Sequence, residues 1–345
     1  IASHLLSGGQ VGEAFPMLLV AAETTLRAGR NRQTVKLLEK AERARSTVSG
    51  DLDPAMEQRY NQRLYALWGS VQSRLGKHRE AMDAWQQSLE VARVRKDVES
   101  VARAQAGVGL ARAALGDVVA ASSGLEQALG RLPQGDPMWA RAAEALARAR
   151  LSRLDVDGAK RLWVELLELG REMGEGTVQA RAMGGLGLIA LVRGRLTEGQ
   201  DLLENAAFRM RDQPNPRVLP EILLRLSELA HAQGQLETAR EKALEAESIA
   251  RDLGRLPVCV SALGMVSRCL LDIGVPHDAR LIAHDAATLA RTLGPVESIM
   301  AVGCVLPVAR VFLALGAIED AGSILPATPP GQGEGTLGID DPIGG

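Results

Sequence analysis

The chain has 345 residues and a net charge of −2, from 40 Lys and Arg against 42 Asp and Glu, which favours neither nucleic acid nor an anionic membrane surface as a partner. Aromatic residues make up only 3% of the composition, and this scarcity of strand-favouring side chains predicts an all-α fold. The three cysteines show no CxxC spacing, which argues against a zinc site and a disulfide framework and predicts small buried residues in a reducing cytosol.

Residues 1–50 are predicted to form the first helices of a helical array. Two steps of five residues from a glycine to a small residue, Gly9 to Ala14 and Gly29 to Thr34, follow one another closely in this segment. The segment begins IASHLLSGG, without an initiator Met and without a basic-then-apolar leader. We therefore expect a piece of a longer protein and no secretion signal.

A repeated spacing dominates residues 51–325. In the stretch LGKHREAMDAWQQSLEVA, residues 75–92, Gly76 is followed by a small residue five positions later and by Trp85 nine positions later. The position of Gly76, which we call the turn position, recurs after steps of 40, 38, 40, 40, 40 and 42 residues, at Gly76, Gly116, Leu154, Gly194, Gly234, Gly274 and Gly316. The residue five positions later is small each time, at Ala81, Ala121, Ala159, Gly199, Ala239, Ala279 and Ala321. This period predicts seven units, each made of a first helix (helix A), a turn and a second helix (helix B).

Helix geometry explains the spacing. A glycine just past helix A can adopt the left-handed conformation that ends a helix. The residues seven before and five after the turn position are small, so we expect helices A and B of one unit to cross there. Trp85 and Ser88 lie further along the same face, and we expect both to pack against the next unit. A second break is predicted midway between successive turn positions, at Gly174, Pro214, Gly254 and Gly294.

The C-terminal part of the chain differs from the other units. Residues 299–318 are apolar enough to imitate a membrane span, but Arg310 and Pro307 favour a buried helix A. The helix B that follows is cut short near residue 325. Residues 326–345 are rich in Pro and Gly without an apolar period, which predicts a disordered tail.

The order of small residue, turn glycine, alanine and bulky apolar residue resembles the tetratricopeptide repeat (TPR), although the period is near 40 residues instead of about 34. Longer, aromatic-poor units of this kind are similar to the sensor arrays of large bacterial signalling proteins, which carry an AAA or STAND-type ATPase, a Ser/Thr kinase or a LuxR-type DNA-binding domain. The resemblance covers about residues 1–325. It implies an α-solenoid, a right-handed superhelix of antiparallel helix pairs.

No catalytic chemistry is predicted for this region. The glycine clusters at 184–187 and 331–335 do not follow a strand and lack a GxxxxGK[ST] pattern, so they do not indicate nucleotide binding. His277 and His284 are two helical turns apart, too far to share a metal without a third element. We expect no enzyme activity, no cofactor and no metal within these residues.

One polar pattern is a candidate binding site. In stacked TPR units helix A lines the concave surface, and the resemblance places there an arginine in each of four consecutive units: Arg63, Arg103, Arg141 and Arg181. We call these four residues the arginine series. Leu110 and Leu188 would lie beside them on the same surface. A row of guanidinium groups could bind carboxylates or phosphorylated side chains. The alternative is that each arginine pairs with a nearby carboxylate such as Glu144 or simply faces water.

These features predict the protein-interaction or sensor region of a larger cytoplasmic bacterial signalling protein, linked to an ATPase or a kinase. Its partner would be a protein, a peptide or a sister domain of the parent chain, bound on the concave face, and neither nucleic acid nor a membrane. The alternatives are a free-standing TPR adaptor and the inducer-binding array of a LuxR-type regulator.

Overall fold

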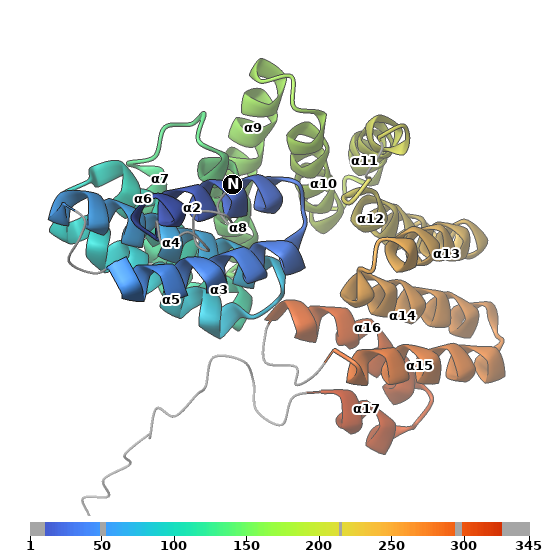
Figure 1. The fold of residues 1–345 in the computed structure, drawn as a ribbon. Helices are drawn as coiled ribbons and strands as arrows, with labels where there is room; N and C mark the ends of the chain where they lie inside the picture. Colours follow the sequence, from blue (N-terminus) through green and yellow to red (C-terminus); the bar gives the residue numbers. More distant parts are fainter. Residues whose placement is uncertain (1–10, 49–52, 214–215, 294–298, 326–345) are drawn as a thin grey trace, which may run out of the picture. The chain divides into compact units, whose positions relative to one another are not determined.

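The computed structural model describes residues 11–48, 53–213, 216–293 and 299–325. Within these ranges all regular structure is α-helical, in sixteen helices (Figure 1), which confirms the all-α prediction. The chain divides into two compact units, one of residues 1–114 and 118–214 and the other of residues 115–117 and 215–345. We call them the N-terminal and the C-terminal unit. The predicted disordered tail lies outside the described residues.

The N-terminal unit is built from ten consecutive helices. They are α2 (Val11–Arg27), α3 (Asn31–Val48), α4 (Pro54–Arg74), α5 (His78–Val94), α6 (Val98–Leu115), α7 (Val118–Leu129), α8 (Pro137–Ser152), α9 (Val156–Glu172), α10 (Gly176–Val192) and α11 (Leu196–Arg211). Helices adjacent in sequence pack against each other, as in the pairs α4–α5, α8–α9 and α10–α11. Each pair therefore buries its apolar faces against its neighbours in the chain.

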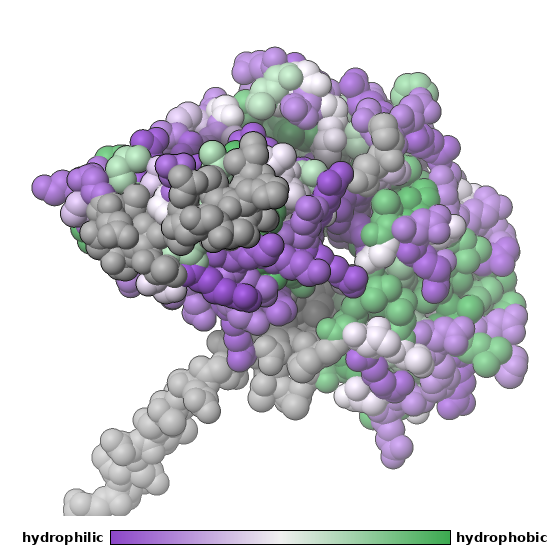
Figure 2. Space-filling model, viewed as in Figure 1, coloured by the Kyte–Doolittle hydropathy of each residue, from purple (hydrophilic) through white to green (hydrophobic). Residues whose placement is uncertain are grey.

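The C-terminal unit follows the same plan. Its helices are α12 (Leu219–Ala232), α13 (Leu236–Asp252), α14 (Leu256–Ile273), α15 (Pro276–Arg291), α16 (Ile299–Ala314) and α17 (Ile318–Ile324). On the face shown in Figure 2, hydrophobic residues gather over α12 and α14. Helix α14 is long and apolar enough to cross a membrane by length and composition, but it packs against α13, α15 and α16 as a core helix of this unit.

Helix α16 contains most of the segment that imitates a membrane span. The helix ends at Ala314, and Gly316 forms the turn that leads into α17. Val305, Val308 and Phe312 of this helix are fully buried. The structure thus agrees with the prediction of a buried helix A for the described part of this segment.

The turn positions have the predicted backbone conformation. All six glycines at these positions have positive φ, between 70° and 96°. The seventh position is held by Leu154, which adopts the same conformation with φ 63° although it has a side chain. Of the second breaks, Gly174 and Gly254 also have positive φ, whereas Pro214 and Gly294 lie outside the described residues.

Small residues sit where helices A and B of one unit cross, as predicted. Ser227, seven residues before its turn position, donates a hydrogen bond of 2.6 Å to the carbonyl oxygen of Ala239, five residues after it. Ser267 makes the same bond to Ala279 one unit later. Backbone and small side chains are therefore in direct contact at the crossing.

Trp85 packs against both its own unit and the next. A methyl group added to Gly69 of α4 would lie 2.7 Å from its ring, and one added to Gly107 of α6 would lie 2.2 Å from it. The prediction for Trp85 is confirmed. Ser88 is fully buried, and its hydroxyl bonds with Gln62 of its own helix A at 3.3 Å, so its packing against the next unit stays a prediction.

Candidate functional site

The arginine series lies on four helices of the N-terminal unit, with Arg63 on α4, Arg103 on α6, Arg141 on α8 and Arg181 on α10. The structure does not treat the four residues alike. Arg63, Arg103 and Arg181 each form an ion pair with a carboxylate of another helix or loop. Arg141 forms none with the described residues, and its side chain is exposed to solvent.

Arg63 and Arg103 hold elements of the unit together. Arg63 pairs with Glu23 of α2, and this contact links α2 to α4. Arg103 binds Asp136 with 2.6 Å between Nε and Oδ2 and also contacts Glu99. Asp136 in turn caps the N-terminus of α8 by accepting a 2.7 Å hydrogen bond from the Met138 backbone N–H. The charges of these two arginines are therefore already used within the fold.

The surroundings of Glu23 show how strong its pairing is. Burial by itself would raise the pKa of this carboxyl. The hydrogen bonds and positive charges of Arg63 and Arg27 outweigh this effect, so its pKa is lowered overall. Glu23 thus stays ionised and keeps Arg63 occupied.

Arg141 lies among other positive charges. Surrounding protein removes water from its guanidinium and lowers its pKa, and the charges of Arg74 and Arg181 lower it further. Glu144 is the one carboxylate that acts in the opposite direction. The oxygens of Glu144 are bound by Arg148 at 2.8 Å and by Arg181 at 3.2 Å. We call Arg74, Arg141, Arg181 and Glu144 the arginine cluster.

The arginine cluster carries more positive than negative charge. Arg74 comes from the C-terminal end of α4, where its guanidinium also donates to the carbonyl oxygen of Leu26 in the last turn of α2. Arg74 could not be predicted from the repeat, because no other unit carries an arginine at the equivalent position. The positive charges of Arg74 and Arg181 near Arg141 make this position favourable for an added anion.

Apolar side chains accompany the arginines on the same helix faces. Leu110 lies seven residues after Arg103 on α6, and Leu188 lies seven residues after Arg181 on α10, so each pair shares one face two turns apart. Both leucines are half-buried. The surface is therefore mixed, with apolar area beside positive charge.

The described residues contain no group of three His, Cys, Asp or Glu side chains that could hold a metal ion. The three cysteines are buried in the C-terminal unit. Burial raises the pKa of Cys269 and Cys304 to about 11, which keeps their thiols protonated and poorly reactive. His284 packs against the ring of Phe312, with 5.0 Å between ring centroids.

No protein-family model matches the sequence, and no curated protein matches it. Solved structures with the same fold do exist. The apo form of the quorum sensor NprR from B. thuringiensis matches with a TM-score of 0.65 and 11% identity, over 90% of this chain and 85% of that one. The Rap conjugation gene regulator of the plasmid pLS20, in complex with the Phr* peptide, matches with a TM-score of 0.52 and 12% identity, over 89% of this chain and 97% of that one.

A third similar structure is a Signal Transduction ATPase with Numerous Domains (STAND) protein with a tetratricopeptide repeat sensor from Pyrococcus horikoshii. It matches with a TM-score of 0.53 and 14% identity, over 94% of this chain and 50% of that one. The chain thus spans about half the length of this STAND protein. At these identities the matches show the fold alone, and they confirm a TPR-like α-solenoid.

Proposed function

We propose that the N-terminal unit recognises a peptide or a protein segment and that Arg141 binds an anionic group of this partner. The observation that carries the proposal is the state of Arg141. Its guanidinium is partly desolvated, lies near two other arginines and has no ion-pair partner among the described residues. Arg141 is exposed to solvent and therefore accessible, and the nearby charges of Arg74 and Arg181 repel it. A ligand that brings a carboxylate or a phosphate would offset this repulsion and could accept hydrogen bonds from the guanidinium.

The apolar side chains favour a peptide over a sugar or a bare ion. Leu110 and Leu188 share helix faces with the arginine series and stay half-exposed. A peptide can place an apolar side chain on such a leucine while its acidic side chain or C-terminal carboxylate reaches Arg141. Two of the similar structures support this choice, since one is a quorum sensor and another is bound to a peptide.

The same similarities support a regulatory role. Binding on a stack of helix pairs can change the curvature of the array and so bias a domain attached to it. The STAND protein carries its tetratricopeptide repeats as a sensor. We therefore propose a sensor region of a cytoplasmic bacterial signalling protein whose other part is an ATPase or a kinase.

Peptide selection followed by affinity measurement tests the proposal. The chain would be screened against a peptide library with free C-terminal carboxylates, and selected peptides would be measured by fluorescence polarisation. Arg141→Gln should raise the Kd of selected peptides about 10- to 150-fold, since a hydrogen bond to a charged group contributes about 1.5–3 kcal/mol. Arg153→Gln, at the exposed C-terminal end of the same helix, is the matched control and should leave the Kd unchanged.

Amidated and free forms of each selected peptide separate two sources of the anion. A loss of affinity on amidation assigns Arg141 to the C-terminal carboxylate, and no loss assigns it to an acidic side chain. Equal affinity of every selected peptide for the native chain and for Arg141→Gln would contradict the proposed role of Arg141.

A further inference from the structure

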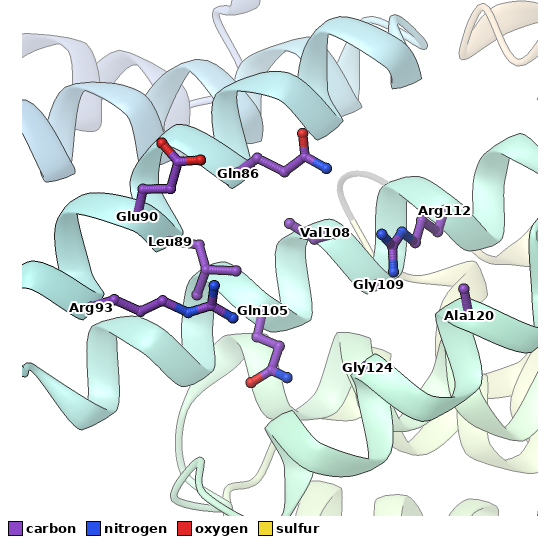
Figure 3. A pocket seen from close by; sticks show the side chains of 10 residues that line it. All are labelled: Gln86, Leu89, Glu90, Arg93, Gln105, Val108, Gly109, Arg112, Ala120 and Gly124. Carbon is purple, nitrogen blue, oxygen red and sulfur yellow. The ribbon is translucent and has the colours of Figure 1, made fainter.

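A second polar site lies between α5, α6 and α7 of the N-terminal unit. Here the structure contains a cavity of about 420 Å³ (Figure 3). Its charged lining residues are Arg93 and Glu90 of α5 and Arg112 of α6. The volume falls within the range of about 300–1,000 Å³ that is usual for small-molecule sites.

The cavity is separate from the surface of the arginine series. Arg112 lies nine residues after Arg103, which at about 100° per residue places it on the opposite side of α6. Gln105 and Val108 of α6 also line the cavity, whereas Leu110 lies on the side of Arg103. A ligand in the cavity would therefore not touch the surface proposed to bind a peptide.

A glycine opens the cavity at a position where four of the other six units carry Leu or Ile and the remaining two carry Ala84 and Lys242. Gly124 lies eight residues after its turn position, where the following units carry Leu162 and Leu202. Leu162 is buried, with 8% of its surface exposed. A methyl group added to Gly124 would meet no atom within 4 Å, although the residue lies inside helix α7. A glycine weakens a helix interior, and no neighbouring atom requires one at this position. The absence of a side chain here leaves the space of the cavity open.

The repeat also shows that Arg112 lacks a partner that its equivalent possesses. Arg150 stands four residues before its turn position, as Arg112 does, and pairs with Glu126 of the preceding helix B at 2.8 Å. Glu126 lies ten residues after its own turn position, and the equivalent residue for Arg112 is Gln86. The neutral Gln86 lines the cavity beside Arg112. The fold has thus placed a guanidinium here without the carboxylate that pairs with it one unit later.

The second arginine of the cavity has no internal partner either. Neither Arg93 nor Arg112 forms a side-chain hydrogen bond or an ion pair with the described residues, and Glu90 pairs with neither of them. Figure 3 shows the two guanidinium groups directed toward each other across the space between the helices. Gln105 lines the same cavity, and its amide donates a 2.7 Å hydrogen bond to Gln127 of α7.

We infer that this cavity binds a small organic anion. Arg112 and Arg93 would hold its carboxylate or phosphate group, because two guanidinium forks match the geometry of either group. The amide of Gln86 would donate a further hydrogen bond, and Leu89 and Val108 would contact the apolar part of the ligand. The inference does not depend on the proposed peptide site.

Calorimetric titration of the purified chain with inorganic phosphate, citrate and adenosine monophosphate tests the inference. At least one of the three should bind with a Kd of millimolar or below, more weakly as salt is added. Preference for citrate assigns the site to carboxylates, and preference for the other two assigns it to phosphates. Failure of all three to bind would overturn the inference.

Two substitutions locate the binding and should not unfold the chain. Gly124→Leu fills the cavity as Leu162 fills the next unit, and Gln86→Glu gives Arg112 the carboxylate that Arg150 already has. Each should weaken binding at least tenfold and leave the unfolding temperature equal or higher. Arg171 occupies the position in a later repeat that Arg93 occupies in its own repeat. Arg171→Gln is therefore the control and should leave anion binding unchanged.

The outcomes separate this inference from the proposed peptide site. Arg141→Gln should leave anion binding in the cavity unchanged, and Gly124→Leu should leave peptide binding unchanged. Anion binding that survives both Gly124→Leu and Gln86→Glu would show that the ion binds elsewhere and would overturn the inference.

Discussion

The contact between Trp163 of α9 and Gly185 of α10 allows a quantitative test of how the repeats stack. Trp163 is buried, with 2% of its surface exposed, and a methyl group added to Gly185 would lie 2.2 Å from its ring. Gly185→Ala must therefore displace a rigid ring or move α10 away from α9. The equivalent positions one unit earlier hold Leu125 and Ala145, so a smaller residue replaces the tryptophan where a larger one replaces the glycine.

The size of the effect follows from two opposing terms. Overpacking a filled core costs about 1–3 kcal/mol, whereas Ala in place of Gly inside a helix returns about 1 kcal/mol. Gly185→Ala should thus lower the free energy of unfolding by about 0–2 kcal/mol. In a chain that carries Trp163→Leu the clash is absent, and only the gain in helix stability from replacing Gly with Ala remains. The two substitutions should therefore couple by about 1–3 kcal/mol, within the range found for residues in contact.

Urea unfolding followed by circular dichroism measures this coupling. Four proteins are compared: the native chain, each single variant and the double variant. Gly124→Ala, a helical glycine with nothing within 4 Å of the added methyl group, gives the helix term alone and should act equally in both backgrounds. If Gly185→Ala changes the free energy of unfolding by the same amount with and without Trp163, the tryptophan does not determine the need for glycine.

Three further predictions concern strain, thiols and one carboxylate. Leu154→Gly should raise the free energy of unfolding by about 0.5–1 kcal/mol, because Leu154 has φ 63° and is 84% exposed, and a lower urea midpoint would refute this. Cys269 and Cys304, with pKa values of about 11, should react with a disulfide reagent at about pH 8 only as the protein unfolds, and rapid reaction of the folded protein would refute this. Glu23→Gln should lower stability at neutral pH by about 0.5–1 kcal/mol through the loss of the Arg63 pair. Because the pKa of Glu23 is lowered in the fold, this stabilisation is present above pH 4.5 and is lost as the pH falls through the lowered pKa, so a difference from the native chain that does not shrink as the pH falls below 4.5 would refute it.

Local and periodic features of the fold could be predicted from the sequence. A turn glycine acts through its own backbone, so its recurrence every 40 residues or so gives the helix boundaries directly. The pairing of tryptophan with glycine was also present in the sequence, since Gly107 follows Trp85 at the same spacing as Gly185 follows Trp163. That signal could have been used to identify the contacts between successive units.

From the sequence, the candidate site could be predicted only as four arginines at equivalent positions of consecutive repeats. Nothing within a single repeat distinguishes Arg141 from Arg63 or Arg103. The difference comes from carboxylates far away in the sequence, such as Glu23, which lies 40 residues from the arginine it binds. Such partners depend on how neighbouring helices pack, and the period of the repeat does not specify them.

A repeat protein provides its own internal comparison, and this comparison gives the cavity its significance. Equivalent positions face equivalent surroundings, so packing alone would select similar residues at each of them. Arg112 occupies the same position in its unit as Arg150 does in the next, but it faces the neutral Gln86 instead of a carboxylate. This unit therefore has the positive charge without the negative charge that pairs with it one unit later. A guanidinium in a concave site without a counter-charge is disfavoured within the fold alone, and an anion from solution removes that cost. Arg141 is exposed, but it is the member of its series without an ion pair in the described chain and lies near two other arginines, so an added anion there would offset the repulsion between these charges.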